Sequence, residues 1–308
     1  MTQRTDIAIV LVGFNSRSYL QQCVESLQST EWRGYSHHVV YVDNGSSDGS
    51  VEMLRQQLPS ATIIANSQNA GFSKGCNQGA AATDSRYIYL LNIDTLLLPD
   101  SVSSLAEFLD QTPNAGAAGN RLLNADRSDQ WSARRFPTLH NALFGRRSYL
   151  GRRFPNLRPV RHYLYKDELA RGKPFPVDWV PGSCTLVRRE VYNRIGGLPE
   201  EMHYWSDAVF CDRLRRAGWE IYCLPGAALI HFEGNGTGQK SRTLRRWLIS
   251  DFHQGAYQFY CEHYNLGPYN PIRWTAKLGL GLRAELLRIA DLVFPSPKHS
   301  DNPEQKHR

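Results

Sequence analysis

An aspartate at the end of a strongly apolar segment is the first candidate for chemistry in this chain. Residues 87–91, Tyr-Ile-Tyr-Leu-Leu, are followed by Asn92 and, two residues later, by Asp94. Such a run is typical of a buried strand in a parallel sheet, where ligands collect at the carboxyl ends. Because side chains alternate along a strand, Asn92 and Asp94 share a face. The pair is a variant of an Asp-x-Asp metal and phosphate site, and a turn before Pro99 is the alternative for Asp94.

A second aspartate follows another apolar segment. Asp43 comes directly after residues 38–42 and opens the run Asp-Asn-Gly-Ser-Ser-Asp-Gly-Ser. Its carboxylate could accept hydrogen bonds from a nucleotide base or ribose. Residues 69–79, Asn-Ala-Gly-Phe-Ser-Lys-Gly-Cys-Asn-Gln-Gly, form a glycine-rich loop that would let backbone approach a ligand closely. For Asp43 and Asn69, turn formation or helix capping is the alternative.

A third polar cluster contains Asp207. Residues 203–207 read His-Tyr-Trp-Ser-Asp and precede helical spacing over 214–219. The free N–H groups at a helix start favour a carboxylate, which could take a proton from a hydroxyl nucleophile, and N-capping is compatible with that role. Upstream, Gly182 would let backbone pass close to a ligand. Trp179 offers either a flat face for an acceptor ring or a core side chain.

Repeated β-α units are predicted to position these residues. Their length predicts parallel strands with right-handed crossovers, which places Asp43 and Asp94 at the same sheet edge. Strands are expected at 7–12, 38–42, 61–65, 87–91, 115–121, 177–187, 220–224 and 228–232, and helical patterns at 19–27, 51–58 and 100–109.

The bulk composition narrows the function classes. With 308 residues and a formal charge of +7, the chain suits one large α/β domain or two lobes with an anionic partner. The first strand is not followed by Gly-x-Gly-x-x-Gly, and no Gly-Lys-Ser or Gly-Lys-Thr phosphate loop occurs, which disfavours a dinucleotide oxidoreductase and a P-loop ATPase. The six cysteines lack a C-x-x-C pair and are expected to be reduced.

No targeting segment is evident in the sequence. The apolar run 7–12 is too short for a signal-peptide core, and no run reaches the eighteen or so apolar residues of a membrane span. We therefore expect a cytoplasmic protein.

Two basic regions suggest an anionic partner. Residues 134–173 interleave arginines with aromatic residues, a pattern that suits nucleic acid, a lipid diphosphate or an anionic bilayer, with a solvated loop as the alternative. No nucleic-acid-binding signature accompanies it, so we expect no nucleic acid. Basic and apolar residues at helical spacing over 278–289 predict a helix that lies on a membrane or packs on the catalytic domain, and the tail after Pro295 is expected to be disordered.

Four motifs occur in order over ninety residues. They are Val-Gly-Phe-Asn-Ser at 12–16, Val-Asp-Asn-Gly-Ser-Ser-Asp-Gly-Ser at 42–50, Asn-x-Gly-Phe-x-x-Gly-x-Asn-x-Gly at 69–79 and Leu-Leu-Asn-x-Asp-Thr at 90–95. Together they resemble the family-2 glycosyltransferases, especially their rhamnosyltransferase-like bacterial members. The resemblance implies an α/β fold of the GT-A type, with a mostly parallel central sheet flanked by helices and with C-terminal helices.

The resemblance also implies roles for individual residues. It makes Asp207 the catalytic base and Asp94 and His231 the ligands of Mg²⁺ or Mn²⁺. Ser206 and Val209 stand where the family has further acids. The implied donor-binding residues are Asn15, Asp43, Asn69, Gly71, Lys74, Asn77, Asn92 and Gly182. The implied acceptor-binding residues are Trp179, Tyr204 and Trp205.

We therefore predict an inverting, metal-dependent glycosyltransferase. It would move a sugar from a UDP-, dTDP- or GDP-linked donor to a carbohydrate or lipid-linked glycan hydroxyl in cell-surface polysaccharide assembly, with peripheral contact to the inner face of the cell membrane. The expected parts are a nucleotide-sugar-binding half at 1–125 and an acceptor-binding and catalytic half at 126–238, with a basic insert at 134–173. A C-terminal helical region at 239–295 and a disordered tail at 296–308 would follow.

Two alternative functions remain. The absence of acids at Ser206 and Val209 would suit a non-catalytic sugar-nucleotide or polysaccharide-binding homologue. A nucleotidyltransferase should carry a glycine- and Arg/Lys-rich loop after its first strand, where this chain has Gly-Phe-Asn-Ser at 13–16.

Overall fold

The structure, a computed structural model, describes residues 4–138, 151, 153–232 and 242–293. Strands and helices alternate in the first half: β1 (Thr5–Gly13), α1 (Arg17–Gln28), β2 (His37–Asp43), α2 (Ser50–Gln57), β3 (Thr62–Ala65), α3 (Phe72–Ala81), β4 (Ser85–Asn92), β5 (Thr95–Leu97), α4 (Ser103–Gln111) and β6 (Ala115–Leu123). The second half contains α6 (Arg158–Tyr163), α7 (Lys166–Ala170), β7 (Phe175–Pro176), β8 (Cys184–Arg188), α8 (Arg189–Arg194), α9 (Ser206–Arg216), β9 (Glu220–His231), α10 (Arg242–His263) and α11 (Pro271–Val293).

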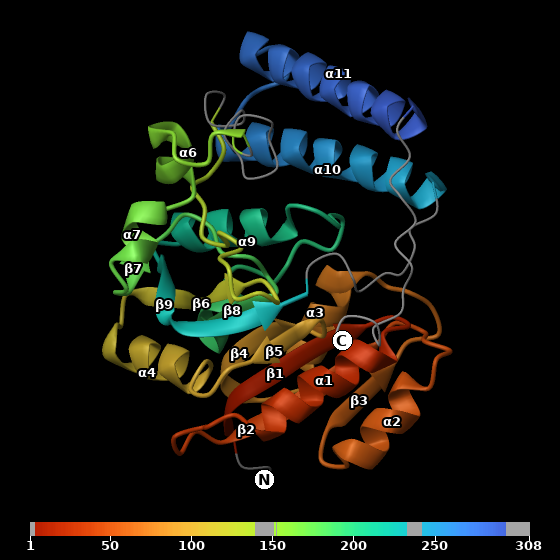
Figure 1. The fold of residues 1–308 in the computed structure, drawn as a ribbon, viewed down its shortest axis with the longest axis vertical. Coiled ribbons are helices and arrows are strands. Elements are labelled where there is room, and N and C mark those ends of the chain that lie inside the picture. Colours follow the sequence, from red (N-terminus) through yellow and green to blue (C-terminus); the bar gives the residue numbers. More distant parts are fainter. Residues whose placement is uncertain (1–3, 139–150, 152, 233–241, 294–308) are drawn as a thin grey trace. The chain divides into compact units, whose positions relative to one another are not determined.

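One mixed sheet joins the two halves (Figure 1). Its strand order is β3-β2-β1-β4-β8-β6-β9-β5, and β7 lies beside β9. The strands β3, β2, β1 and β4 are parallel, as the β-α repeats predicted. Beyond β4 the sheet becomes mixed: β8 runs antiparallel to both β4 and β6, while β6 and β9 keep the direction of the first four strands. The chain reaches β8 through the excursion after β6 and not through a β-α crossover, so no rule requires it to run parallel.

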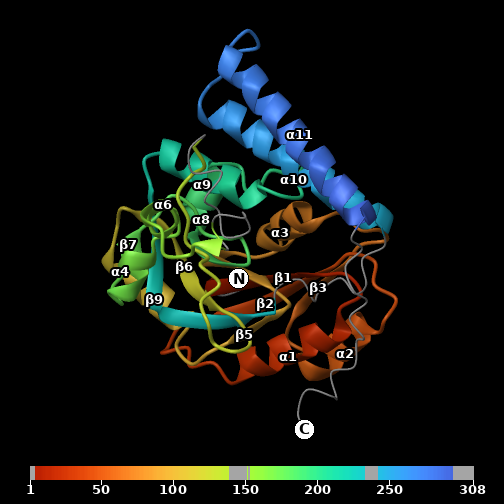
Figure 2. The same ribbon diagram turned by 45° about the horizontal axis from the view of Figure 1, so that its top comes forward.

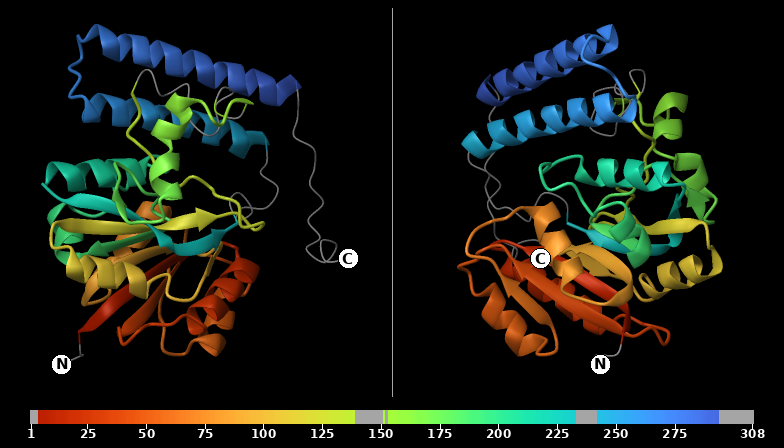
Figure 3. Two further views of the ribbon diagram at one scale, coloured as in Figure 1. Left: turned by 60° about the vertical axis from the view of Figure 1, so that its left-hand side comes forward. Right: turned by 180° about the vertical axis from the view of Figure 1, so that it is seen from behind.

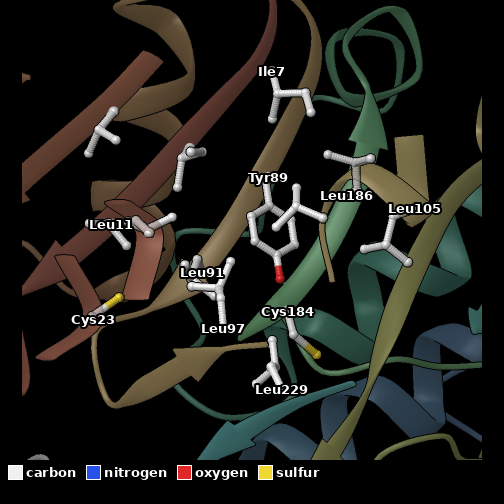
Figure 4. Packing of buried hydrophobic residues seen from close by; sticks show 14 of the residues in the cluster. Ile7, Leu11, Cys23, Tyr89, Leu91, Leu97, Leu105, Cys184, Leu186 and Leu229 are labelled. Carbon is white, nitrogen blue, oxygen red and sulfur yellow. The ribbon is translucent and has the colours of Figure 1, made fainter. Parts of the chain in front are cut away.

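The sheet lies between two layers of helices. Figure 2 shows α1 and α2 on one face and α3, α8 and α9 on the other. The central strands are buried on both faces, which explains their uninterrupted apolar sequences. Tyr89 is fully buried at the centre of the cluster in Figure 4, and its hydroxyl donates to Asn120 Oδ1 at 2.7 Å. This bond satisfies the one polar atom that the tyrosine carries into the core.

Two glycines let α3 pack directly on β1. A Cβ atom at Gly75 would lie 2.7 Å from Val12 Cγ1, and one at Gly79 would lie 2.5 Å from Val10 Cγ1. Side chains at these positions would push the helix away from the strand. The start of α3, which carries the glycine-rich loop, is therefore held close to the carboxyl end of β1.

The two strands expected at 220–224 and 228–232 form one long strand, β9, with an interruption. Its pairing with β6 passes from Asn120↔Leu224 to Arg121↔Ala228, so residues 225–227 loop out of register. Asn120 closes the gap by donating its Nδ2 to Ala227 O at 3.1 Å. The strand then continues to His231 at the sheet edge where the acids lie.

The chain divides into two compact units, Met1–Gly236 and Thr237–Arg308. In the second unit α10 and α11 run side by side in opposite directions (Figure 3). No helix in the described ranges is long and apolar enough to cross a membrane. All six cysteines are free, and all but Cys261 are buried. The expected boundary at residue 125 stays a prediction, and the tail at 296–308 lies outside the described residues.

Candidate active site

The predicted metal ligands meet at the end of the sheet. β5 pairs with β9 so that Thr95 lies opposite His231, and Phe232 donates its N–H to Asp94 O at 2.8 Å. This pairing places His231 Nε2 3.3 Å from Asp94 Oδ1. Both side chains are largely buried, at 11% and 14% exposure, and each keeps some accessible surface. The two residues are 137 positions apart, so the sheet creates the pair.

Gln130 fixes the orientation of the His231 ring. Its Nε2 donates to His231 O at 2.5 Å, and its Oε1 lies 2.9 Å from His231 Nδ1. Because the amide nitrogen must face the carbonyl, the amide oxygen must accept from Nδ1–H. Nε2 then faces the Asp94 carboxylate, with a lone pair in the neutral ring or with an N–H in the imidazolium.

This arrangement fits a divalent cation. A neutral imidazole nitrogen and a carboxylate oxygen are both acceptors, so a positive charge between them, a proton or a metal ion, is needed to hold them together. A metal-ligating histidine usually donates its other ring N–H to a carboxylate, a backbone carbonyl or water, and the Gln130 amide oxygen takes that place here. In the described part of the chain no group of three or more His, Cys, Asp or Glu side chains could hold a metal ion. Asp94 and His231 would therefore supply two ligands, leaving room for phosphate and water oxygens, which hard cations prefer.

Asn92 is joined to the opposite side of the site through backbone. Its N–H donates to Ser183 O at 3.1 Å, and its carbonyl accepts from Thr95 Oγ1 at 2.5 Å. Ser183 follows Gly182, where a Cβ would lie 3.6 Å from Asp207 Cβ. The end of β4 is thus linked to the surroundings of Asp207 by the Asn92–Ser183 hydrogen bond and by Gly182, which precedes Ser183.

Asp207 lies in the first turn of α9, as predicted. Ala208 N–H donates to its Oδ1 at 2.9 Å. Burial raises the pKa of Asp207, while the nearby Arg134 cation and surrounding N–H groups lower it. The indole N–H of Trp179 is near the carboxylate but lacks a hydrogen bond of regular geometry. A partly exposed carboxyl with a raised pKa suits a general base.

Arg134 is a residue that sequence analysis did not single out. It forms a two-residue bridge with Trp179, with backbone bonds of 3.0 and 3.1 Å. Its guanidinium carbon lies 4.7 Å from the centre of the Trp179 ring. Gln130 was missed as well. Both were counted only as polar or basic residues, because their partners are distant in sequence.

The predicted acceptor-binding aromatics differ in how accessible they are. Trp179 is only 6% exposed, since it packs between Arg134 and Trp205, whose ring centre is 5.3 Å away. This packing matches the core alternative for Trp179. Tyr204 and Trp205 keep part of their surface exposed just before α9. The acceptor role stays a prediction for these two residues.

Asp43 orders the loop that follows β2. Its Oδ1 accepts from Tyr41 Oη at 3.0 Å, and its Oδ2 accepts from the N–H groups of Gly45 and Ser46 at 3.1 and 2.8 Å. This is the turn-forming alternative stated above. A carboxylate has about four acceptor positions, so one is left after these three bonds, but Asp43 is only 2% exposed and its contact with a nucleotide stays a prediction. Asn15 cross-links the same loop, because Ser47 N–H donates to its Oδ1 at 2.9 Å.

The glycine-rich loop contains residues with different structural roles. Asn69 Oδ1 accepts from Gly71 N–H at 2.9 Å, which forms a local turn. Gly71 needs to be glycine, since its φ is +86°. Lys74 is exposed on α3. Asn77 bonds to Tyr192, Leu198 and Glu200 through both atoms of its amide, so a structural role accounts for this residue without a donor.

The positions of the missing acids are buried. Ser206 and Val209 are both 4% exposed, so neither points a side chain into solvent. Part of the basic insert and the glycine-containing loop after Phe232 lie outside the described residues. In the described part of the insert, Arg135 stacks over Tyr165 and forms an ion pair with Glu168 at 3.7 Å.

Comparisons with known proteins identify the family of the chain. Residues 8–196 match the family model described as glycosyl transferase family 2. The chain is 29% identical over 296 residues to the N-acetylglucosaminyl-diphospho-decaprenol L-rhamnosyltransferase of Mycobacterium tuberculosis, covering 92% of this chain and 93% of that protein. It is 21% identical to the rhamnosyltransferase WbbL of Escherichia coli, covering 79% and 89%.

A solved structure shares the fold. The mannosyltransferase PcManGT from Pyrobaculum calidifontis, solved in complex with GDP-Man and Mn²⁺, superposes with a TM-score of 0.58 at 16% identity, covering 96% of this chain and 77% of that one.

Proposed function

The chain belongs to glycosyl transferase family 2, and on that premise we propose that Asp94, His231 and Asp207 carry a metal-dependent, inverting sugar transfer. The predicted GT-A class and the rhamnosyltransferase-like resemblance are confirmed. The observation that carries the proposal is the Asp94–His231 pair, 3.3 Å apart at the sheet edge to which Asp207 is connected through Gly182.

The donor is proposed to bind along the ends of β1, β2 and β4. The loop ordered by Asp43 and Asn15 would contact the nucleotide, with Asn69, Gly71, Lys74, Asn92 and Gly182 as further donor contacts. Asp94 and His231 would hold Mg²⁺ or Mn²⁺ against the diphosphate, where the cation would neutralise the charge that develops on the leaving group.

Asp207 is proposed to take the proton of the acceptor hydroxyl. The hydroxyl oxygen forms a bond to the anomeric carbon while the bond from that carbon to the diphosphate breaks, and the proton passes to the Asp207 carboxylate. Attack from the face opposite the leaving group inverts the anomeric centre. Tyr204 and Trp205 precede the base on the chain and would contact the acceptor.

The substrates can be narrowed by analogy. The name of the mycobacterial relative specifies a rhamnosyl group and a lipid-linked N-acetylglucosaminyl diphosphate. We propose the same classes here, in cell-surface polysaccharide assembly at the cytoplasmic side of an anionic membrane. UDP-, dTDP- and GDP-sugars can be compared by thermal shift with Mn²⁺, with Mg²⁺ and without metal.

One variant separates catalysis from binding. Asp207→Asn should keep donor binding and lose donor turnover, since the amide cannot accept the proton. Near-normal turnover would refute the assignment of the base. If the wild-type chain binds a donor but neither transfers nor hydrolyses it, the non-catalytic alternative is correct.

A further inference from the structure

The hairpin of α10 and α11 has an unusual distribution of side chains. In an ordinary surface helix the apolar face packs inward and the polar face meets water. Here small and polar residues lie between the helices: Ala276 and Ala284 are buried, and four α11 residues bond to α10. These pairs are Arg273 with Tyr257, Arg283 with His253, Arg288 with Ser250 and Asp291 with Arg245.

Five large apolar residues of α11 lie on the opposite side and are exposed. The exposed fractions are 60% for Trp274, 74% for Leu278, 61% for Leu282, 58% for Leu286 and 53% for Ile289. The first four are spaced by four residues, so each advances about 40° around the helix. Together they cover an arc of about 120°. This arc is defined here as the outer face of α11.

The shape of the outer face favours a flat partner. A coiled-coil seam is narrow and repeats every 3.5 residues, which keeps its apolar side chains in line. Spacing by four spreads them sideways along a helix of 23 residues, about 35 Å long. Such a broad strip suits a bilayer surface better than a second helix.

The chemistry at the borders of this face also suits a membrane. Lys277 lies over the Trp274 ring at 5.7 Å and flanks the apolar arc. Arg288 pairs with Ser250 of α10 and with Glu285, an acid within the arc, so Lys277 is the basic residue that this border offers to lipid. Tyr269, just before α11, is 93% exposed. Tryptophan and tyrosine favour the headgroup level, and basic side chains favour anionic lipids. The chain as a whole carries a formal charge of +7.

We propose that the outer face of α11 is a docking surface for an anionic membrane, on which the helix lies without crossing it. This inference extends the proposed function by naming the surface that would bring the enzyme to a lipid-linked acceptor. The insert at 134–173 is not required for it.

The test is flotation of the full chain with vesicles of phosphatidylcholine, with and without phosphatidylglycerol. The wild type should float with the anionic vesicles. The double variant Leu278→Gln, Leu282→Gln should reduce binding about tenfold or more, since two half-inserted leucines lose their apolar burial. Lys277→Gln should weaken binding to the anionic vesicles alone.

Matched controls keep the test specific. Leu157→Gln removes an apolar residue of 42% exposure from the first unit and should leave flotation unchanged. The double variant should retain its circular dichroism spectrum and its donor hydrolysis, so a loss of vesicle binding is distinct from a failure of the proposed reaction.

Two results would overturn the proposal. One is vesicle binding that persists in the double variant. The other is a wild type that does not bind vesicles and forms a dimer in sedimentation velocity, while the double variant is a monomer. The outer face would then bind a second copy of this chain.

Discussion

Arg134 is expected to keep Asp207, the proposed catalytic base, ionised. Its cation lowers the pKa of Asp207, which burial raises. Replacing Arg134 with methionine keeps most of the side-chain stem over Trp179 and removes the charge. As the pH is lowered, the rate of the variant should begin to fall at a higher pH than the rate of the wild type, because Asp207 must be deprotonated to accept the proton of the acceptor hydroxyl.

The expected size of the shift follows from the geometry. An opposite charge at about 4–6 Å lowers the pKa of an aspartate by about 1–3 units. Arg134 stacks on Trp179 at 4.7 Å and does not form a direct ion pair with Asp207 in the described part of the chain. Without a direct ion pair, the effect of Arg134 on the pKa of Asp207 is expected at the small end of this range. On the acidic limb the rate of the variant should be about tenfold lower than the rate of the wild type at the same pH, and the plateau at higher pH should be the same for both.

The assay is the pH profile of kcat/KM, with two control variants. Arg134→Lys keeps a positive charge and should leave the acidic limb near its wild-type position. Arg135→Met removes the adjacent arginine, which pairs with Glu168, and should not move the limb. If Arg134→Met leaves the limb in place, or if Arg135→Met moves it as far, the electrostatic role of Arg134 is wrong.

Three further substitutions test other parts of the site. Asp207→Asn should raise the melting temperature while turnover is lost. Because the pKa of Asp207 is raised in the folded state, the wild type loses stability as pH rises above the unfolded-state pKa, and the variant does not. Calorimetry should therefore find a larger increase in melting temperature near neutral pH than near the unfolded-state pKa, and an equal increase at both would contradict this. Gln130→Ala should weaken Mn²⁺ binding about 10- to 100-fold in titration calorimetry, because the His231 ring loses the partner that orients it; unchanged affinity would remove Gln130 from this role. Gly79→Ala should destabilise the fold by about 1–3 kcal/mol in urea unfolding, because its Cβ would lie 2.5 Å from Val10 Cγ1, and wild-type stability would show that α3 can move outward.

The parts of the site that lie at strand ends could be predicted from sequence. Asp43 and Asp94 each follow a long apolar run, so local pattern and sheet topology were enough to place both acids at one edge. His231 was different. Its place beside Asp94 depends on the antiparallel pairing of β5 with β9, which no local pattern reveals, and only the family resemblance pointed to it.

The roles of residues that act through partners distant in sequence could not be predicted from the sequence. Gln130 gains its role from His231, and Arg134 from Trp179 and Asp207, each through contacts set by tertiary structure. The direction of β8 was missed for a related reason, since antiparallel entry depends on how the chain returns after β6. For Trp179 the sequence left two roles open; the burial of its ring favours the core role, and its acceptor role stays a prediction.

One short segment after β6 supports both sides of the proposed reaction. Gln130 holds His231, Ser132 Oγ lies 3.3 Å from Leu122 N and 3.5 Å from Asn120 O, and Arg134 pairs with Trp179. The segment is not extended throughout, because Trp131, between Gln130 and Ser132, has a left-handed φ of +51°. The three contacts are therefore set residue by residue within a stretch of five residues. The proposed metal side and the proposed proton-accepting side of the site both depend on the fold of this one segment.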